Sequence, residues 1–187
     1  MNVYKLIYWL IIQSRLYQNW SRLYKFLFQR KYKNMVYIDT TTSPEALQLR
    51  LDRITYHKDT IKQLFDVVHS PYYCKYVLDC AEKNDQPEGS FDCDDYSMLA
   101  IHMLDEHFNP KLLGVTYKKK NKKFKFGGHM VCYFETLYGF RHMGNQGLST
   151  VYKSLEAMVK DIAYRADGDL IGYTVFDKDL KVIKVNI

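Results

Sequence analysis

Cys93 is the residue best placed for chemistry in this sequence, because a loop turns into a helix at that position. Pro, Gly and Asn are gathered in residues 84–89, and apolar residues then recur at helical spacing from Tyr96 to Met103. Asp92 is a good N-cap, which makes Cys93 the first helical residue. Free backbone N–H groups and the helix dipole stabilise an anion there, so the thiol can ionise below its usual pKa of about 8.5 and become a nucleophile.

Three carboxylates beside the thiol oppose its ionisation. Asp92, Asp94 and Asp95 would each repel a thiolate. Solvent and salt screen this repulsion if Asp92 folds back to cap the helix and Asp95 points away along the surface. Even then, a reactive Cys93 needs a cationic partner elsewhere in the chain.

His129 and Asn145 are the candidates for the base and for the group that orients it. His129 follows two glycines and begins an apolar run, so it is expected at the entrance of a strand, with room for a substrate beside it. Asn145 lies past one hairpin turn, at the end of the next expected strand. Adjacent antiparallel strands can bring two such side chains within hydrogen-bond reach. A thiol nucleophile needs both kinds of partner.

The elements that must position these residues are helices first and an antiparallel sheet after, which indicates an α+β fold with the Cys-bearing helix at its centre. Periodicity predicts helices over 44–54, 59–68, 73–80, 93–108 and 155–165. Strands are predicted over 35–38, 112–117, 124–134, 140–143, 171–176 and 182–187. The six lysines of 118–125 are expected at the solvated tip of a hairpin, with attraction to an anionic surface or substrate as the alternative.

A basic arm over residues 1–34 is expected to precede one domain over 35–187. The arm carries a charge of +7 and the rest of the chain −1, which together give the net charge of +6. Its apolar run over 3–12 is too short to cross a bilayer, which takes about 20 residues, and no signal-peptide cleavage site follows. The amphipathic pattern favours docking on the domain or on a partner protein, then binding to an anionic membrane surface, and nucleic acid last.

The four cysteines are expected to be reduced, in a cytoplasmic protein that is either free or peripheral to a membrane. A chain of 187 residues can build a core without disulfides, and no C-x-x-C pair is present. Cys74, Cys80 and Cys132 are expected in the core. No cofactor or metal is expected, because the sequence lacks the spacings of calcium loops and zinc sites. The sequence does not indicate an oligomeric state.

Five short motifs follow one another between residues 44 and about 150. They are Ile54–Asp59, Phe65-Asp66 with Pro71, Gly89–Tyr96, Gly128–Val131 and Gly144-Asn145. This order resembles the transglutaminase-like cysteine peptidase superfamily, which shares the papain-like fold. The resemblance implies that Cys93 is the nucleophile, His129 the general base and acid, and Asn145 the orienting residue. Phe91 stands where the family usually has Gly, and no Gln occupies the papain-type position upstream of Cys93, so the second oxyanion donor is unassigned.

The resemblance therefore implies a thiol-dependent hydrolase or acyltransferase. It would cleave or transfer an amide bond in a peptide or protein through an acyl-enzyme, with charged His129 as the cation that Cys93 needs. The alternative is an inactive transglutaminase-like fold that serves as a binding or structural protein, recruited to a membrane or an assembly by residues 1–34.

Overall fold

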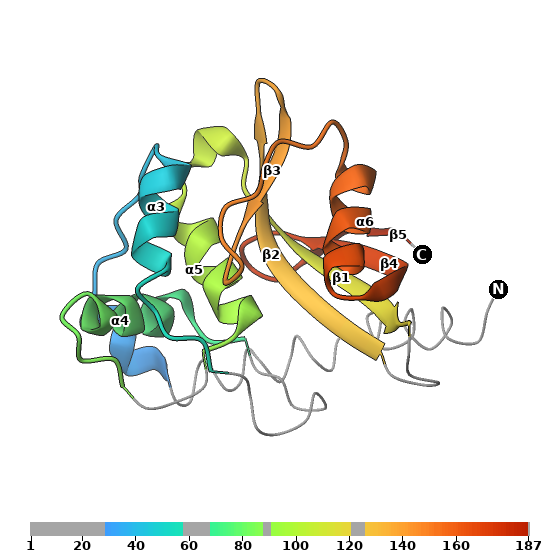
Figure 1. Ribbon diagram of the computed structural model, residues 1–187. Helices are drawn as coiled ribbons and strands as arrows, with labels where there is room; N and C mark the ends of the chain where they lie inside the picture. The colour runs from blue at the N-terminus through green and yellow to red at the C-terminus, as the bar shows by residue number, and fades with distance from the viewer. Residues whose placement is uncertain (1–28, 58–67, 88–90, 121–125, 187) are drawn as a thin grey trace.

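The computed structural model describes residues 29–57, 68–87, 91–120 and 126–186, and it shows a mixed α+β fold. Three α-helices precede the sheet in the sequence and lie on one side of it, and a fourth lies on the other side (Figure 1). The α-helices are α3 (Pro44–Leu51), α4 (Pro71–Ala81), α5 (Cys93–Met103) and α6 (Leu155–Arg165), and the two short 3-10 helices are η2 (Arg30–Asn34) and η3 (Glu106–Phe108).

The sheet has five antiparallel strands in the order β3-β2-β1-β4-β5. Its strands are β1 (Lys111–Lys119), β2 (Phe126–Thr136), β3 (Gly139–Met143), β4 (Gly168–Phe176) and β5 (Val182–Asn186). Three hairpins, β1–β2, β2–β3 and β4–β5, join neighbours in sequence, whereas α6 crosses over before β4 pairs with β1. The predicted α+β class and the antiparallel sheet are thus confirmed.

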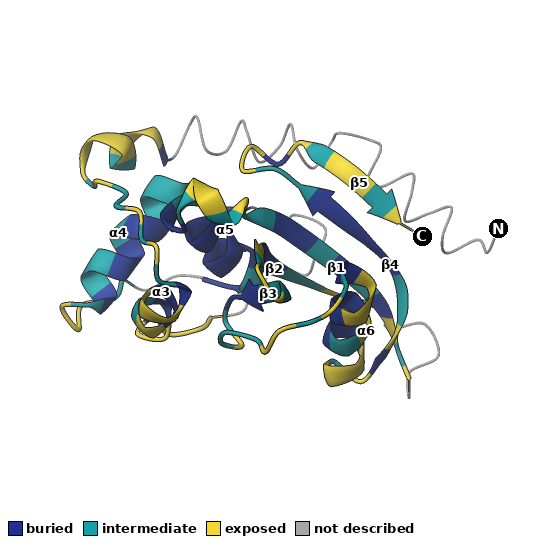
Figure 2. Cartoon of the chain, turned by 90° about the horizontal axis from the view of Figure 1, so that it is seen from above, coloured by how far each residue is buried: buried dark blue, intermediate teal, exposed yellow. Residues whose placement is uncertain are grey.

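Each face of the sheet is covered by its own apolar cluster. On one face α5 packs against Leu112, Cys132 and Phe134, and α3 and α4 pack around α5. On the other face α6 packs against side chains such as Val131 and Tyr133. Figure 2 shows α5 almost entirely buried between the sheet and the other helices, while β5 forms an exposed edge. The helix that begins at Cys93 is therefore held firmly by core contacts along its length.

Two predicted elements differ from the structure. The segment over 35–38 is not a strand: Met35 and Tyr37 are exposed, and the isolated bridge in this region lies further on, between Thr41 and Leu104. That bridge also explains why α5 ends at Met103 rather than near 108. The Thr41 N–H donates to the Met103 carbonyl and the Asp105 N–H to the Thr41 carbonyl, so the chain leaves the helix there.

The end of the expected N-terminal arm packs on α4. Gln29 is buried and accepts a hydrogen bond from the Ser70 N–H at the N-cap of that helix. The ring of Tyr32 lies 5.1 Å from the rings of both Tyr73 and Tyr76. Docking of the arm on the domain is thus observed for its last residues. The rest of the arm and the helix predicted over 59–68 lie outside the described residues, apart from Val68 in the latter.

Candidate active site

Cys93 is the first residue of α5, as predicted, and its side chain is half-buried. Asp92 is the N-cap in extended conformation, and Asp95 completes a capping box: the Asp92 N–H donates to Asp95 Oδ2 at 3.4 Å. The Ser97 hydroxyl donates to the Cys93 carbonyl at 2.6 Å, which fixes the first turn. The thiol therefore lies at the positive end of a buried helix, where an anion is stabilised.

Asp95 does not point along the surface but turns into the protein. It is 2% exposed and accepts hydrogen bonds from the His69 N–H at 3.0 Å and from His69 Nδ1 at 2.8 Å. Burial raises the pKa of Asp95, and the contact with His69 opposes that rise. From the sequence, solvent is expected to screen the charge of an exposed Asp95. In the structure Asp95 is instead buried and paired with the imidazole of His69.

His69 is a residue of this region that the sequence did not reveal. It lies directly before the Ser70-Pro71 start of α4, and its ring packs on Tyr73 with centroids 4.7 Å apart. Through Asp95 it ties the start of α4 to the start of α5. A lone histidine in a loop gives no sequence signal for such a role, because its partner is 26 residues away.

His129 lies on β2, opposite Val115 of β1. The side chain is half-buried, and its Nε2 atom is shielded from solvent with no hydrogen-bond partner within the described ranges. Burial lowers the pKa of His129 to about 4, although the charge of Asp92 opposes this. The imidazole is therefore neutral at neutral pH, and the charged His129 expected beside Cys93 is not what the structure indicates. A neutral imidazole can still accept a proton.

Asn145 lies in the turn that follows β3. The Gly147 N–H donates to the Gly144 carbonyl at 3.1 Å, and the same carbonyl accepts from Gln48 Nε2 of α3 at 3.0 Å. Asn145 Oδ1 is buried and has no partner among the residues that the structure describes. The β2–β3 register ends at the pair of Cys132 with Met143, and neither His129 Nε2 nor Asn145 Oδ1 has a hydrogen-bond partner among the described residues, so the structure does not join these two atoms.

Two electrostatic contacts relate α5 to this part of the sheet. Asp92 acts on the pKa of His129, and Cys93 is the second cause, after burial, of the raised pKa of Tyr117. Tyr117 pairs with Gly127 while His129 pairs with Val115, so both side chains project from the same face of the sheet. That face is the one that α6 covers, whereas α5 packs on the opposite face of the sheet. The start of α5 nevertheless lies within electrostatic range of both residues.

One group of side chains could hold a metal ion. Within the described ranges, the ligand atoms of Asp92, Cys93 and Asp94 lie within 4.8 Å of one another. Their proximity follows from the helix start, since Asp92 Oδ1 also accepts from the Asp94 N–H at 3.3 Å. Two carboxylates and a thiol without an imidazole form a mixed set of hard and soft ligands, which does not match the usual zinc or calcium sites.

The other cysteines have different surroundings. None of the four forms a disulfide, and Cys74 and Cys132 are fully buried, as expected of core residues. Burial raises the pKa of the Cys132 thiol. Cys80 on α4 is half-buried, like Cys93, so the expectation that it lies in the core is wrong. It is therefore a natural reference for the reactivity of Cys93.

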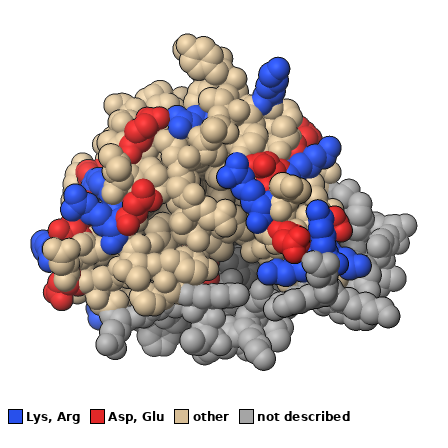
Figure 3. Space-filling model, viewed as in Figure 1, with Lys and Arg blue, Asp and Glu red and all other residues tan. Residues whose placement is uncertain are grey.

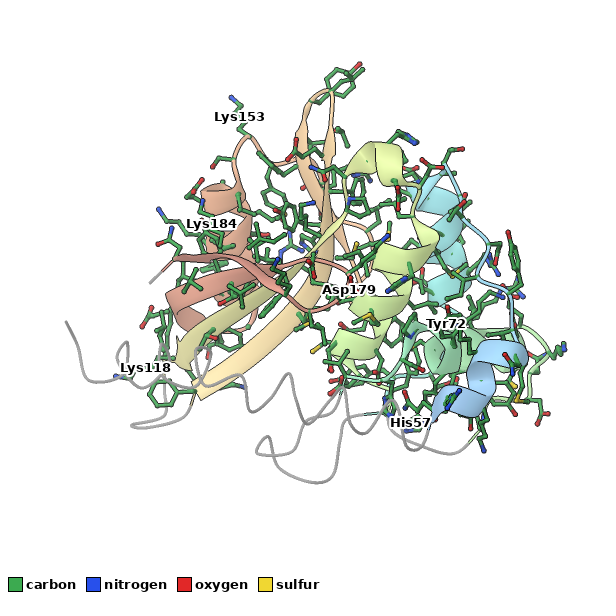
Figure 4. All side chains as sticks on the ribbon, turned by 180° about the vertical axis from the view of Figure 1, so that it is seen from behind. His57, Tyr72, Lys118, Lys153, Asp179 and Lys184 are labelled. Carbon is green, nitrogen blue, oxygen red and sulfur yellow. The ribbon has the colours of Figure 1, made fainter. Side chains whose placement is uncertain are left out.

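A cavity of about 310 Å³ lies at the opposite end of α5 from Cys93. Residues from the end of that helix, from the loop before β1 and from the β4–β5 turn line it, including His102, Lys111 and Lys178. His57 lies near the start of α5, because it pairs with Phe91 just before the N-cap. In Figure 4, His57 and Lys118 lie in the lower part of the view and Lys153 lies near the top.

The surface around the fold carries charges of both signs. Figure 3 shows Lys and Arg interspersed with Asp and Glu on both flanks of one face, with uncharged side chains between them. None of the helices among the described residues has the length and apolar character that spanning a membrane requires.

Comparison with known proteins adds no relative: neither a scan against models of protein families nor a search of curated proteins finds a match.

Proposed function

We propose that Cys93, His129 and Asn145 are the nucleophile, the base and the orienting residue of a thiol-dependent hydrolase or acyltransferase. The observation that carries this proposal is a complementary pair of unsatisfied atoms. His129 Nε2 and Asn145 Oδ1 are both buried, and each lacks a partner within the described part of the chain. A buried polar atom without a partner costs about 1–3 kcal/mol, so such atoms call for an explanation.

An imidazole N–H and an amide oxygen are the donor and acceptor that a Cys-His-Asn triad joins. A movement of the Asn145 turn that brought the two atoms into contact would let Nε2–H donate to Oδ1, which would leave His129 Nδ1 as the base for the Cys93 thiol. Apo sites often hold such bonds loosely and tighten them around a substrate. The fold around them, with a Cys-bearing helix packed on an antiparallel sheet, is compatible with the transglutaminase-like, papain-like architecture.

The chemistry follows from a neutral base. His129 takes the thiol proton as sulfur attacks the carbonyl carbon of an amide, and the carbonyl oxygen becomes an oxyanion near the Cys93 backbone N–H. Collapse of this intermediate breaks the C–N bond, and imidazolium gives its proton to the leaving amine. Water or a second amine then releases the acyl group from sulfur. The substrate class that suits this sequence of steps is an amide bond in a peptide or protein.

A second candidate is a binding or structural protein of the same fold without turnover. One observation favours it: the pKa of His129 is lowered to about 4, so no imidazolium is ready to stabilise a thiolate among the carboxylates of the helix start. The two candidates differ in the reactivity of one sulfur.

Alkylation of the full-length protein by iodoacetamide separates them. We expect Cys93 to be labelled at pH 7.5 at least about tenfold faster than Cys80, the cysteine with comparable exposure, since one unit of pKa changes the thiolate fraction tenfold. His129→Ala should remove most of that advantage, and Asn145→Ala part of it. Peptide mass spectrometry measures each site. Equal rates at Cys93 and Cys80, unchanged by His129→Ala, would favour the scaffold.

A further inference from the structure

Tyr117 lies flat on the sheet, across strands β4, β1 and β2, where two glycines leave space for its ring. A Cβ atom added at Gly168 of β4 would lie 2.9 Å from Tyr117 Cβ and Cγ. One added at Gly127 of β2 would lie 2.7 Å from Cζ and 2.9 Å from the hydroxyl oxygen. Real Cβ atoms do not approach other atoms so closely, so both positions need glycine for the ring to lie as it does.

These glycines place the hydroxyl end of the Tyr117 ring over β2, near His129. The ring begins over β4 and ends over Gly127, which stands two residues before His129 on β2. Tyr117 and His129 project from the same face of the sheet, because Tyr117 pairs with Gly127 and Val115 with His129. Tyr117 is 7% exposed, and its hydroxyl makes no hydrogen bond to any residue that the structure describes.

Neighbouring tyrosines of the same face serve as a comparison. Tyr173 of β4 has a hydroxyl engaged with Glu156 and Asn186, each at 3.2 Å, and so has a structural task. Tyr133 of β2 is as buried as Tyr117 but lies four residues beyond His129, away from the start of α5. Of the three tyrosines compared, Tyr117 is thus the one that lies beside His129 and whose hydroxyl has no hydrogen-bond partner among the described residues.

We propose that the Tyr117 hydroxyl is the second hydrogen-bond donor to the oxyanion that forms when Cys93 attacks a carbonyl group. This inference rests on the proposed function and fills the position for which the sequence offers no donor. As the C–S bond forms, the π electrons of the carbonyl move to its oxygen. The Tyr117 O–H and the Cys93 backbone N–H then donate to that oxygen, and neither proton is transferred.

The electrostatics of the site agree with a donor role. Burial, and after it the charge of Cys93, raise the pKa of Tyr117. The hydroxyl therefore keeps its proton throughout the pH range in which a thiol enzyme works. A donor of this kind is typically worth a factor of about 10²–10³ in rate.

Two reactions of the same sulfur test the proposal on the full-length protein. Acylation by p-nitrophenyl acetate passes through a tetrahedral oxyanion, whereas alkylation by iodoacetamide does not. We expect Tyr117→Phe to slow acylation of Cys93 by about a hundredfold and to change its alkylation by less than about twofold. The matched control, Tyr133→Phe, should leave both rates close to those of the unmodified protein. Release of p-nitrophenol and peptide mass spectrometry give the two rates.

The outcomes distinguish this inference from the proposed function. If Cys93 is acylated rapidly and Tyr117→Phe acylates as fast, the Tyr117 role is overturned while the nucleophile stands. If Cys93 is acylated no faster than Cys80, the proposed function fails and this inference fails with it. A general disturbance of the fold by Tyr117→Phe would lower both rates together, and that result would also overturn the donor role. Gly127→Ala, which must displace the ring, should reproduce the selective loss of acylation.

Discussion

Two buried histidines on neighbouring strands give this protein an acid-sensitive pair. Burial lowers the pKa of His129 to about 4, and burial together with the charge of His129 lowers that of His142 to about 4 as well. His142 is packed parallel to Tyr152, with ring centroids 6.0 Å apart, and its Nδ1 has no partner among the described residues. Protonation of either ring would place a positive charge where burial disfavours it, and this would destabilise the folded protein.

The pH dependence of unfolding follows from that arrangement. In the unfolded chain each of these histidines binds a proton below its ordinary pKa of 6.5, whereas in the folded chain it does so only below about pH 4. The free energy of unfolding therefore falls as the pH drops from about 6.5 to about 4. We expect His142→Phe to restore up to about 3 kcal/mol of this loss, since one unit of pKa is worth 1.36 kcal/mol. Urea denaturation at pH 7 and pH 4 measures it.

The control for that change is His57→Gln, because His57 is exposed and its side chain makes no ion pair with any residue that the structure describes. It should leave the difference between the two pH values unchanged. If His142→Phe and the unmodified protein lose stability in parallel as the pH falls, the burial of an uncharged His142 would not be what resists acid.

At the scale of the elements, the start of α5 is joined to the start of α4. The His69–Asp95 pair is buried, and Asp95 also accepts from the Asp92 N–H. Breaking a buried pair leaves a charged or polar group without a partner, which typically costs about 3–5 kcal/mol. The position of Cys93 thus depends on a contact that crosses between two helices.

A double-mutant cycle can measure this link. We expect Asp95→Asn and His69→Gln each to lower the free energy of unfolding by roughly 2–4 kcal/mol and their coupling to exceed about 1 kcal/mol, because each change removes the other's partner. The reference pair is Asp161 and Arg165 of α6, which are joined at 2.7 Å but whose side chains are 30% and 62% exposed, so a coupling of about 0.5 kcal/mol is expected. Equal coupling in the two pairs, by urea denaturation, would contradict a special role for the buried pair.

The sequence predicted local elements better than their assembly. The helix over 155–165 has the predicted bounds and its Ser154 cap, and the hairpins follow from period-two runs with turn residues between them. Pairing of β1 with β4 joins strands from separate hairpins, which no local pattern encodes. The prediction of a strand over 35–38 is wrong for a related reason: an apolar run of this length forms a strand only where it can pair with the edge strand of a sheet.

The candidate site divides in the same way. Cys93 was recognisable because its cap, its helix and its loop are contiguous in the sequence, and His129 and Asn145 because they flank one hairpin. His69 and Tyr117 were not recognisable, because their roles depend on Asp95 in one case and on two glycines of flanking strands in the other. The charge state of His129 also needed the structure, since it is set by burial.

At the scale of the whole molecule, the charge is concentrated at one end of the chain. Residues 1–34 carry +7, and the remainder sums to −1. Gln29 and Tyr32, near the end of this arm, already pack on α4, so part of it serves the fold. Four of the basic residues precede that docked part, namely Lys5, Arg15, Arg22 and Lys25. An anionic surface is the kind of partner that such a group of positive charges attracts.

Co-sedimentation with phosphatidylserine vesicles tests whether that partner is an anionic membrane. A basic residue near such a surface is worth about 1 kcal/mol, so changing these four residues to Gln should weaken binding by up to roughly a thousandfold. A matched variant with Lys118, Lys119 and Lys120 changed to Gln removes three charges from the sheet and should bind nearly as well as the unmodified protein. Binding should also fall steeply with salt, because screening shortens the range of the attraction. If the protein does not sediment with vesicles at low salt, or if the two variants sediment equally, the result would contradict membrane binding and favour a partner protein for the arm.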